Sequence, residues 1–203
     1  MSQAGDHWDE RYAGEDFWYG TEPNDFLKDR AAALPARGRV LCLGEGEGRN
    51  ATFLAAQGHT VVALDASAVG LAKAKRLAAE RRVRIETTQA DLADYRFEPA
   101  AWDAIVSIWC HLPHDLRARV HRGVVDALRP GGAYLLESYT PAQLSFRTGG
   151  PKSLDLLPSL AELRAELAGL RLEVGLERER EVHEGRAHNG RSAVVQVLAR
   201  KQA

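Results

Sequence analysis

Residues 40–50 read VLCLGEGEGRN, and this stretch decides the fold. A short apolar run ends at three alternate glycines, Gly44, Gly46 and Gly48, and a helical pattern rich in alanine and leucine follows. A strand, a tight turn and a helix in this order expose bare backbone at the turn, where ligands of open α/β sheets bind. The sequence therefore predicts a ligand-binding turn directly after the first strand.

The acidic residues between these glycines, Glu45 and Glu47, favour a cationic ligand over a phosphorylated one. A phosphate charge about 5 Å from a carboxylate is repelled by roughly 3 kcal/mol at an effective dielectric near 20. S-adenosylmethionine carries a sulfonium, an ammonium and one carboxylate but no phosphate, so it suits such a turn. The alternative is that both glutamates point to water and that the loop is an ordinary turn.

An acidic residue also ends the second predicted strand. Asp65 follows the β-rich run 60–64 and lies 21 positions after Gly44. A carboxylate at this spacing grips ribose hydroxyls, because it accepts hydrogen bonds from both of them. The alternative is that Asp65 caps the helix that starts near Ser67.

The third predicted strand, near residues 83–88, leads into Ala90-Asp91-Leu92. A carboxylate here accepts a hydrogen bond from an adenine amino group, while Leu92 packs against the ring. Asp91 equally suits a cap for the short segment 92–95. Three acidic features at successive strand ends nevertheless fit one pocket, because ligands of open parallel sheets bind at the carboxyl ends of the strands.

The remaining periodicity predicts a three-layer, doubly wound α/β fold with a mostly parallel seven-stranded sheet and a C-terminal antiparallel hairpin. The hairpin follows from the alternating runs 172–180 and 192–200, with a polar loop at 181–191 between them. We expect the other strands near 39–43, 60–64, 83–88, 102–108 and 132–138, and helices near 24–33, 49–57, 67–81, 114–128 and 160–167.

Composition agrees with a single domain covering residues 1–203, with an N-terminal segment 1–36 and a core 37–203. A net charge of −1 gives no electrostatic case for nucleic acid or an anionic membrane as partner. No apolar run is long enough to span a membrane, and the N-terminus does not resemble a signal peptide. Two cysteines do not make a disulfide framework, so we expect a cytoplasmic protein. No group of residues has metal-ligand spacing.

The N-terminal segment is unusually aromatic, with Trp8, Tyr12, Phe17, Trp18 and Tyr19 within a dozen residues. These rings suit a lid over the cofactor, because a cation against an aromatic face gains about 0.5–2 kcal/mol. They equally suit a plug that packs the segment onto the core.

The ordered set of motifs resembles the class I S-adenosylmethionine-dependent methyltransferases. The resemblance rests on the glycine turn, on Asp65, and on the stretches 90–92, 102–107 and 128–132. Short motifs are similar to the tellurite-resistance branch, which acts on chalcogen oxyanions: 8–12, 19–20, 23–24, 48–50 and, in the tail, 182–183, 189–190 and 198–201. Cys42 departs from the family pattern, which often has an acidic residue there, and Glu45 or Glu47 would substitute for it.

The resemblance implies a Rossmann-like methyltransferase that transfers a methyl group from S-adenosylmethionine to a small-molecule acceptor, leaving S-adenosylhomocysteine. We expect a chalcogen oxyanion or a soft, thiol-like acceptor, and a monomer or small homo-oligomer. The expected catalytic residues are His111, His183 and Arg191. The expected cofactor-binding residues are Trp8, Tyr12, Trp18, Tyr19, Gly44, Glu45, Gly46, Glu47, Gly48, Arg49, Asn50, Asp65, Ala66, Ser67, Ala90, Asp91, Leu92 and Ser107.

Two other function classes stay open at this point. A nicotinamide-dependent oxidoreductase has a similar fold, but its glycine turn must tolerate phosphate, and the two glutamates argue against that. A non-catalytic S-adenosylmethionine-binding module would bind the cofactor and methylate nothing.

Overall fold

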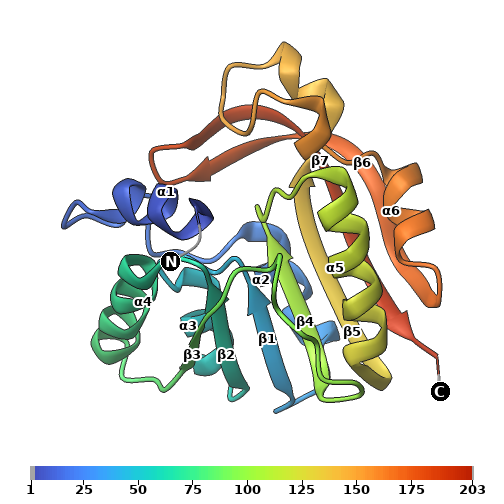
Figure 1. Cartoon of the computed structure of the whole chain (residues 1–203), viewed down its shortest axis with the longest axis horizontal. Coiled ribbons are helices and arrows are strands. Elements are labelled where there is room, and N and C mark those ends of the chain that lie inside the picture. Colours follow the sequence, from blue (N-terminus) through green and yellow to red (C-terminus); the bar gives the residue numbers. More distant parts are fainter. Residues whose placement is uncertain (1–2, 203) are drawn as a thin grey trace.

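The computed structural model describes residues 3–202 and contains one seven-stranded mixed sheet flanked by helices (Figure 1). The strand order is β3-β2-β1-β4-β5-β7-β6, and β7 runs antiparallel to both of its neighbours. This topology confirms the expected doubly wound α/β fold with its antiparallel C-terminal hairpin. The strands are β1 (Arg39–Leu43), β2 (Thr60–Asp65), β3 (Glu86–Gln89), β4 (Trp102–Ile108), β5 (Leu128–Tyr139), β6 (Leu170–Glu184) and β7 (His188–Lys201).

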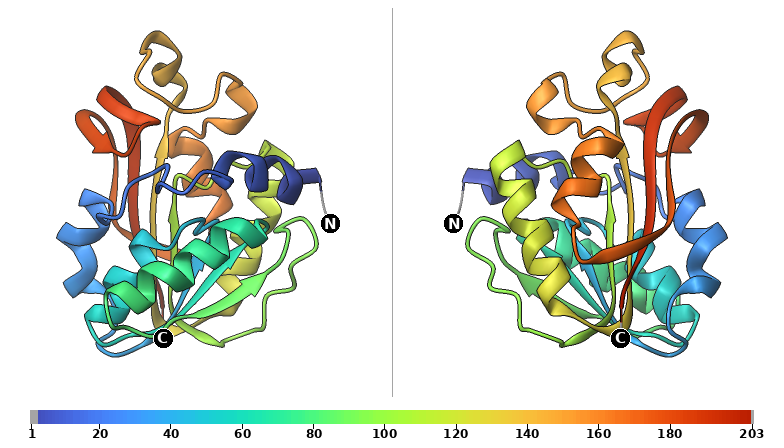
Figure 2. Two further views of the ribbon diagram at one scale, coloured as in Figure 1. Left: turned by 90° about the vertical axis from the view of Figure 1, so that its left-hand side faces the viewer. Right: turned by 90° about the vertical axis from the view of Figure 1, so that its right-hand side faces the viewer.

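Helices cover both faces of the sheet, as the two side views show (Figure 2). Strand β1 is buried on both sides, so it reads as a continuous apolar run. Val40 and Cys42 face the helices of one layer, whereas Leu41 and Leu43 face those of the other. The first layer holds α2 (Asp25–Arg30), α3 (Arg49–Ala56) and α4 (Ala68–Glu80), and the second holds α5 (His114–Ala127) and α6 (Leu160–Glu166).

The third glycine of the turn is required by the packing of α3 against α4. Gly48 precedes α3 with a φ of +89°, in the left-handed region that favours glycine. A Cβ at this position would lie 2.6 Å from the Cβ of Ala74 on α4 and 2.7 Å from its Cα. Gly48 is therefore needed so that α3 can pack closely against α4. This explains why the turn has a third glycine although Gly48 does not line the pocket.

The N-terminal segment crosses the carboxyl end of the sheet as helix α1 (Gln3–Tyr12) and the loop after it (Figure 1). Asp9 fastens α1 to the start of α4, because its carboxylate accepts hydrogen bonds from Ser67 Oγ at 2.5 Å and from the Val69 amide at 3.0 Å. The carbonyl of Trp18 accepts a hydrogen bond from the Arg186 amide, 3.0 Å away at the hairpin tip. The segment is thus held at both ends over the sheet.

The hairpin differs from the expected one. Its strands continue to Glu184 and from His188, so three residues connect them where the sequence predicts a polar loop over 181–191. The upper part of this ribbon projects beyond the sheet and reaches the N-terminal segment (Figure 1). Because this ribbon projects from the sheet, the side chains on its exposed face are polar. The sequence of these strand residues therefore resembles that of a loop. The longer pairing places Glu184 and His188 in the sheet, where both are buried.

Other boundaries differ by a few residues. Strand β3 begins at Glu86, three residues later than expected, and the 24–33 stretch divides into α2 and a 3-10 turn at Ala31–Ala33. Strand β5 begins at Leu128 because Leu128 pairs with Trp102 before a bulge, and the register resumes at Ala133. None of the helices within residues 3–202 has both the length and the apolar character needed to cross a membrane.

Candidate active site

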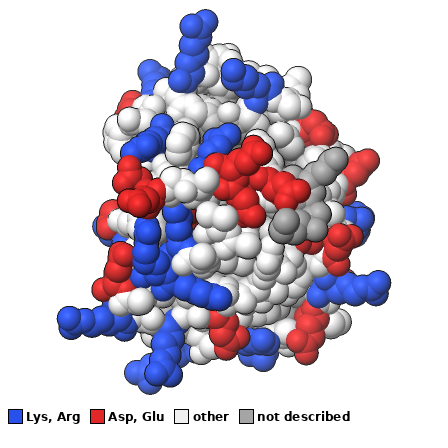
Figure 3. Space-filling model, turned by 60° about the vertical axis from the view of Figure 1, so that its left-hand side comes forward, with Lys and Arg blue, Asp and Glu red and all other residues white. Residues whose placement is uncertain are grey.

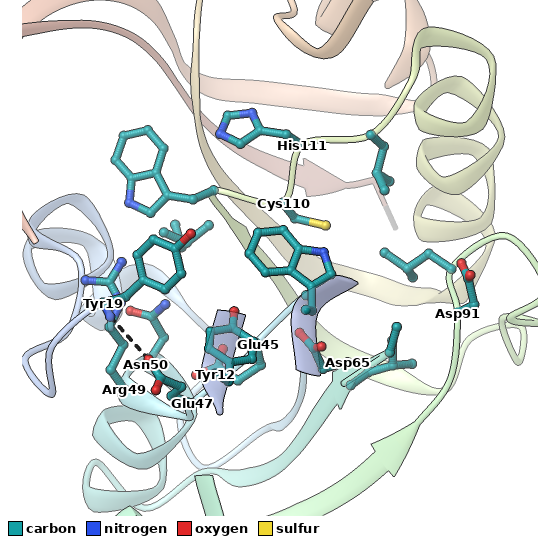
Figure 4. A pocket seen from close by; sticks show the side chains of 18 of the residues that line it. Tyr12, Tyr19, Glu45, Glu47, Arg49, Asn50, Asp65, Asp91, Cys110 and His111 are labelled. Atoms are coloured by element: carbon teal, nitrogen blue, oxygen red, sulfur yellow. Dashed lines mark hydrogen bonds between the residues drawn. The ribbon is translucent and has the colours of Figure 1, made fainter. Parts of the chain in front are cut away.

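A pocket with a cavity volume of about 130 Å³ lies at the carboxyl ends of β1, β2 and β4, beneath the N-terminal segment. It runs from Asp91 at one end to Tyr19 at the other, with Asp65 and Glu45 between them (Figure 4). Of the expected cofactor-binding residues, those that line it are Trp8, Tyr12, Tyr19, Gly44, Glu45, Glu47, Arg49, Asn50, Asp65, Ala66, Ala90, Asp91 and Leu92.

The glycine turn allows the N-terminal segment to approach closely. Gly46 has a φ of +58°, and a Cβ there would lie 2.5 Å from the Tyr12 hydroxyl oxygen. Tyr12 is buried on this turn and its ring stacks on Trp8, with centroids 5.7 Å apart. Gly46, Gly48, Ser67, Ser107 and Trp18 are not among the lining residues. The Gly46 amide and the Ser67 amide donate to Asp65, and Trp18 packs between the guanidinium groups of Arg11 and Arg186.

Asp65 points from the end of β2 toward the glycine turn. Its carboxylate accepts hydrogen bonds from the Gly46 amide at 2.7 Å and the Ser67 amide at 2.8 Å. Burial raises the pKa of Asp65, and these amides oppose that rise. The side chain that caps α4 belongs to Ser67, which accepts from the Gly70 amide, so the explanation of Asp65 as the cap of that helix is wrong.

The two glutamates of the turn are both buried, so the alternative that they point to water is wrong. Glu45 accepts a hydrogen bond from the Ala51 amide at 2.7 Å, and burial raises its pKa to about 7. Glu47 forms an ion pair with Lys73 at 2.8 Å and accepts a hydrogen bond from the Tyr19 amide at 3.2 Å. The charge of Glu47 is therefore balanced by Lys73, and Glu45 titrates near neutral pH.

Asp91 caps a turn and also lines the pocket. One carboxylate oxygen accepts a hydrogen bond from the Ala93 amide at 2.8 Å, as a turn cap does. The same side chain is half-buried and lies at one end of the pocket (Figure 4), which Leu92 also lines. The turn therefore orients the carboxylate without removing it from the pocket.

The end of the pocket opposite Asp91 contains residues that were not expected there. Trp109, at the end of β4, and His188, at the start of β7, line it together with His111. Burial lowers the pKa of His111 to about 4 and that of His188 to about 3, so both imidazoles are neutral at pH 7. His188 was not among the expected catalytic residues, and its burial depends on the hairpin register. Trp109 follows a strand end, which is a signal that could have identified it.

Cys110 also lines the pocket, beside Gly44. Burial raises the pKa of its thiol to about 12, so Cys110 is a protonated thiol at neutral pH. Within residues 3–202, no group of three or more His, Cys, Asp or Glu side chains is arranged to hold a metal ion.

His183 and Arg191 lie outside the pocket, which corrects the expectation that they act in catalysis. Both side chains are on the exposed face of the ribbon, because side chains alternate between the two faces of a strand. The His183 ring is 2.9 Å from Asn189 Oδ1, and Arg191 donates to Glu179 at 2.7 Å. Of the three expected catalytic residues, only His111 lines the pocket.

A buried ionic network supports this end of the pocket from behind. Glu184 accepts hydrogen bonds from Arg49 at 2.5 Å, Trp109 Nε1 at 2.6 Å, Asn24 at 2.8 Å and Arg180 at 3.0 Å. Although burial opposes it, the Arg49 charge and these bonds lower the pKa of Glu184. The network connects α3, β4, the hairpin and the residue before α2.

Comparison with known proteins identifies the type of domain. A family model described as "Methyltransferase domain" matches residues 40–132. A 2-heptyl-1-hydroxyquinolin-4(1H)-one methyltransferase of Mycobacteroides abscessus is 28% identical over 157 residues, which are 76% of this chain and 69% of the relative. A malonyl-[acyl-carrier protein] O-methyltransferase of Enterobacter lignolyticus is 32% identical over 155 residues, 72% of this chain and 60% of the relative.

The fold is shared with solved methyltransferase structures. TehB from Haemophilus influenzae superimposes with a TM-score of 0.71 at 19% identity, covering 98% of this chain and 67% of TehB. The domain match, the curated relatives and the sheet order agree with one another. The protein is a methyltransferase with the fold of the class I S-adenosylmethionine-dependent enzymes.

Proposed function

We propose that the pocket binds S-adenosylmethionine and that the protein transfers its methyl group to a small-molecule acceptor. When bound, the cofactor supplies an electrophilic methyl group on a sulfonium. The observation that carries the proposal is the buried Asp65 carboxylate beside the glycine turn, in a pocket also lined by Glu45 and Asp91. These residues fit the cofactor because they offer acceptors to hydroxyl, amino and cationic groups.

We assign the parts of the cofactor along the length of the pocket. Asp91 and Leu92 would hold the adenine, Asp65 the ribose, and Gly44, Glu45 and Asn50 the methionine part. The reactive methyl would then lie toward Trp109 and His111, which also line the pocket. The stacked pair Trp8 and Tyr12 would cover the ribose and exclude water, and residues 1–36 would serve as a lid on a single catalytic domain.

The lining residues disfavour the nicotinamide alternative. Arg49 is the sole Lys or Arg among the described residues of the lining, and it is paired with Glu184. A pyrophosphate would therefore meet carboxylates and no free cation, and such like-charge contacts cost several kcal/mol in a buried site. A binding module without activity would need no acceptor compartment, whereas the pocket continues past the glycine turn to His111 and His188.

Catalysis would depend mainly on alignment. The acceptor's lone pair attacks the methyl carbon in line with the departing sulfur, and holding the two reactants together contributes up to about 7–11 kcal/mol. We propose a chalcogen oxyanion or a soft, thiol-like nucleophile as the acceptor, based on the sequence resemblance to the tellurite-resistance branch. The hydroxyquinolinone named as substrate of the Mycobacteroides abscessus relative also favours a small-molecule acceptor.

We further propose a monomer or small homo-oligomer in the cytoplasm, without a nucleic-acid or membrane partner. Basic and acidic side chains are interspersed on the face shown in Figure 3, and the whole chain has a net charge of −1. Neither nucleic acid nor an anionic membrane is attracted strongly by such a distribution. Both cysteines are free thiols, which agrees with a reducing compartment.

Calorimetry with S-adenosylhomocysteine, S-adenosylmethionine and NAD tests the cofactor, with binding expected for the first two. Incubation with methyl-labelled S-adenosylmethionine and a panel of tellurite, selenite and small thiols tests the transfer. Binding of NAD in preference to the adenosyl compounds would overturn the proposed function.

A further inference from the structure

Five rings form a continuous stack at the end of the pocket beyond the glycine turn. In order they are Tyr19, His188, Trp109, Tyr139 and His111, and we call this set the ring wall. Centroid distances along it are 5.0, 5.0, 4.4 and 5.6 Å, and all four interplanar angles are below 30°. The rings come from the N-terminal segment, the hairpin and the ends of β4 and β5. The wall therefore forms only in the complete tertiary structure.

The ring wall is held rigidly. Trp109 adopts a φ of +54°, a left-handed conformation that is rare for a large side chain, and its Nε1 donates to Glu184 at 2.6 Å. His188 Nδ1 lies 2.8 Å from the Tyr139 hydroxyl, and His111 Nδ1 lies 3.3 Å from Ser138 Oγ. Four of the rings line the pocket, whereas Tyr139 is fully buried behind them, and the His111 Nε2 atom is buried without a hydrogen-bond partner. The surface offered to an acceptor is therefore largely aromatic.

The cation that lines this end of the pocket is already paired, and Arg11, whose charge acts on Tyr19, does not line it. Both imidazoles of the wall are neutral at pH 7 because they are buried. The Arg49 guanidinium is bound by Glu184, and nearby Arg180 is bound by Glu137 at 2.7 Å as well as by Glu184. Toward the glycine turn the lining is acidic, with Glu45, Glu47 and Asp65. A desolvated oxyanion here would lack the cationic donors that buried anions need.

We propose that the acceptor is an uncharged, flat heteroaromatic molecule that packs against the ring wall and carries a soft nucleophile, such as a heteroaromatic thione. This inference rests on the proposed function, and it selects the thiol-like acceptor over the oxyanion. In the transfer step the thione sulfur forms a bond to the methyl carbon. The carbon–sulfonium bond breaks with its electron pair going to the sulfur of S-adenosylhomocysteine, and the ring N–H proton passes to water.

The absence of a strong base at the wall agrees with this step. A neutral imidazole with a pKa of about 3 or 4 holds a proton poorly at pH 7, so His188 and His111 do not act as bases. A thione needs no base before the attack, because its sulfur lone pair is already available and its proton leaves afterwards.

Two probes that differ by one charge test the inference on the intact protein. These are 2-mercaptopyridine, which is neutral at pH 7, and 2-mercaptonicotinic acid, which adds a carboxylate to the same ring. Binding of S-adenosylhomocysteine is measured first by calorimetry, and its absence would contradict the proposed function itself. With the cofactor site competent, we expect methylation of 2-mercaptopyridine with kcat/KM at least about tenfold above that of the acid. We expect no methylation of selenite or tellurite.

The inference is overturned if the oxyanions are methylated, if both thiones react equally, or if neither thione is methylated by protein that binds the cofactor. A variant pair adds a second measurement. Tyr19→Lys places a cation at the ring wall and should shift the ratio of the two thiones toward the acid by about tenfold. Ala13→Lys adds the same charge to an exposed position of the same segment and should leave the ratio unchanged. An unchanged ratio in Tyr19→Lys that still binds the cofactor would also count against the inference.

Discussion

Arg49 and Glu184 are 135 positions apart in the chain, yet their side chains form a buried ion pair of 2.5 Å. Arg49 starts α3 directly after the glycine turn, and Glu184 ends β6 at the hairpin tip. The pair therefore joins the cofactor end of the pocket to the ribbon that carries His188. Through this ion pair the hairpin helps to hold the residues of the pocket in place.

We expect Glu184→Gln to destabilise the protein by about 3–5 kcal/mol, because removal of one partner leaves the Arg49 charge buried without full compensation. Urea denaturation followed by circular dichroism measures this change. Glu179→Gln is the matched control in the same strand. Its ion pair with Arg191 is exposed and contributes at most about 1 kcal/mol. Equal midpoints for the two variants would contradict the importance of the buried network.

We expect Asp65→Ala to weaken S-adenosylhomocysteine binding by about 1–3 kcal/mol, since ribose hydroxyls would lose their acceptor. Calorimetry gives the dissociation constant directly, and thermal unfolding corrects for any loss of fold caused by freeing the Gly46 and Ser67 amides. Asp94→Ala removes an exposed carboxylate just after the Asp91 turn and should bind as the unaltered protein does. Unchanged affinity in Asp65→Ala would mean that the ribose lies elsewhere.

Cofactor binding should depend on pH through Glu45, whose pKa burial raises to about 7. Below that value the side chain is neutral, and above it the side chain is a carboxylate that attracts the sulfonium and ammonium groups. The groups facing it are Arg49 and Asp65, with the buried Cys42 thiol behind. We therefore expect affinity for S-adenosylmethionine to increase as pH rises from 6 to 8, with bound cofactor lowering the pKa of Glu45.

Calorimetric titrations at several pH values measure this dependence. Glu45→Gln keeps the shape of the side chain and removes its titration, so its affinity should vary much less over the same range. A parallel slope in the two proteins would assign the pH dependence to another group.

Gly48→Ala should destabilise the protein by about 3 kcal/mol or more, because the added Cβ meets the backbone of α4 at a position with φ of +89°. Differential scanning calorimetry would record this as a lowered Tm. Gly14→Ala is the control, since a Cβ there meets no atom within 4 Å. A Tm for Gly48→Ala equal to that of the control would show that α3 and α4 tolerate separation.

Most of the fold followed from local patterns. The run into Gly44 and the spacing to Asp65 were sufficient to predict β1, the turn, α3 and β2, because a parallel sheet buried on both faces is apolar almost throughout. The acidic side chains that line the pocket could be predicted for a similar reason. Asp65 and Asp91 lie at strand ends, and the ends of parallel strands meet at one edge of the sheet.

The part of the pocket proposed to bind the acceptor could not be predicted from such local patterns. His183 was expected in the site, whereas His188 lines it, and the difference between them is the pairing register of β6 with β7. Register depends on the contacts that the whole ribbon makes, including the Arg49–Glu184 pair. Glu45 and Glu47 looked equivalent in the sequence, but Lys73 on α4 balances one of them alone.

The sequence by itself determined the sheet, the glycine turn and the row of acidic strand ends, because these depend on side-chain period and on backbone geometry over a few residues. Only the tertiary structure decided which charges are balanced and which rings form the wall. Those properties arise where the N-terminal segment, α3, the ends of β4 and β5 and the hairpin tip meet, and burial at that junction controls both the pKa values and the packing.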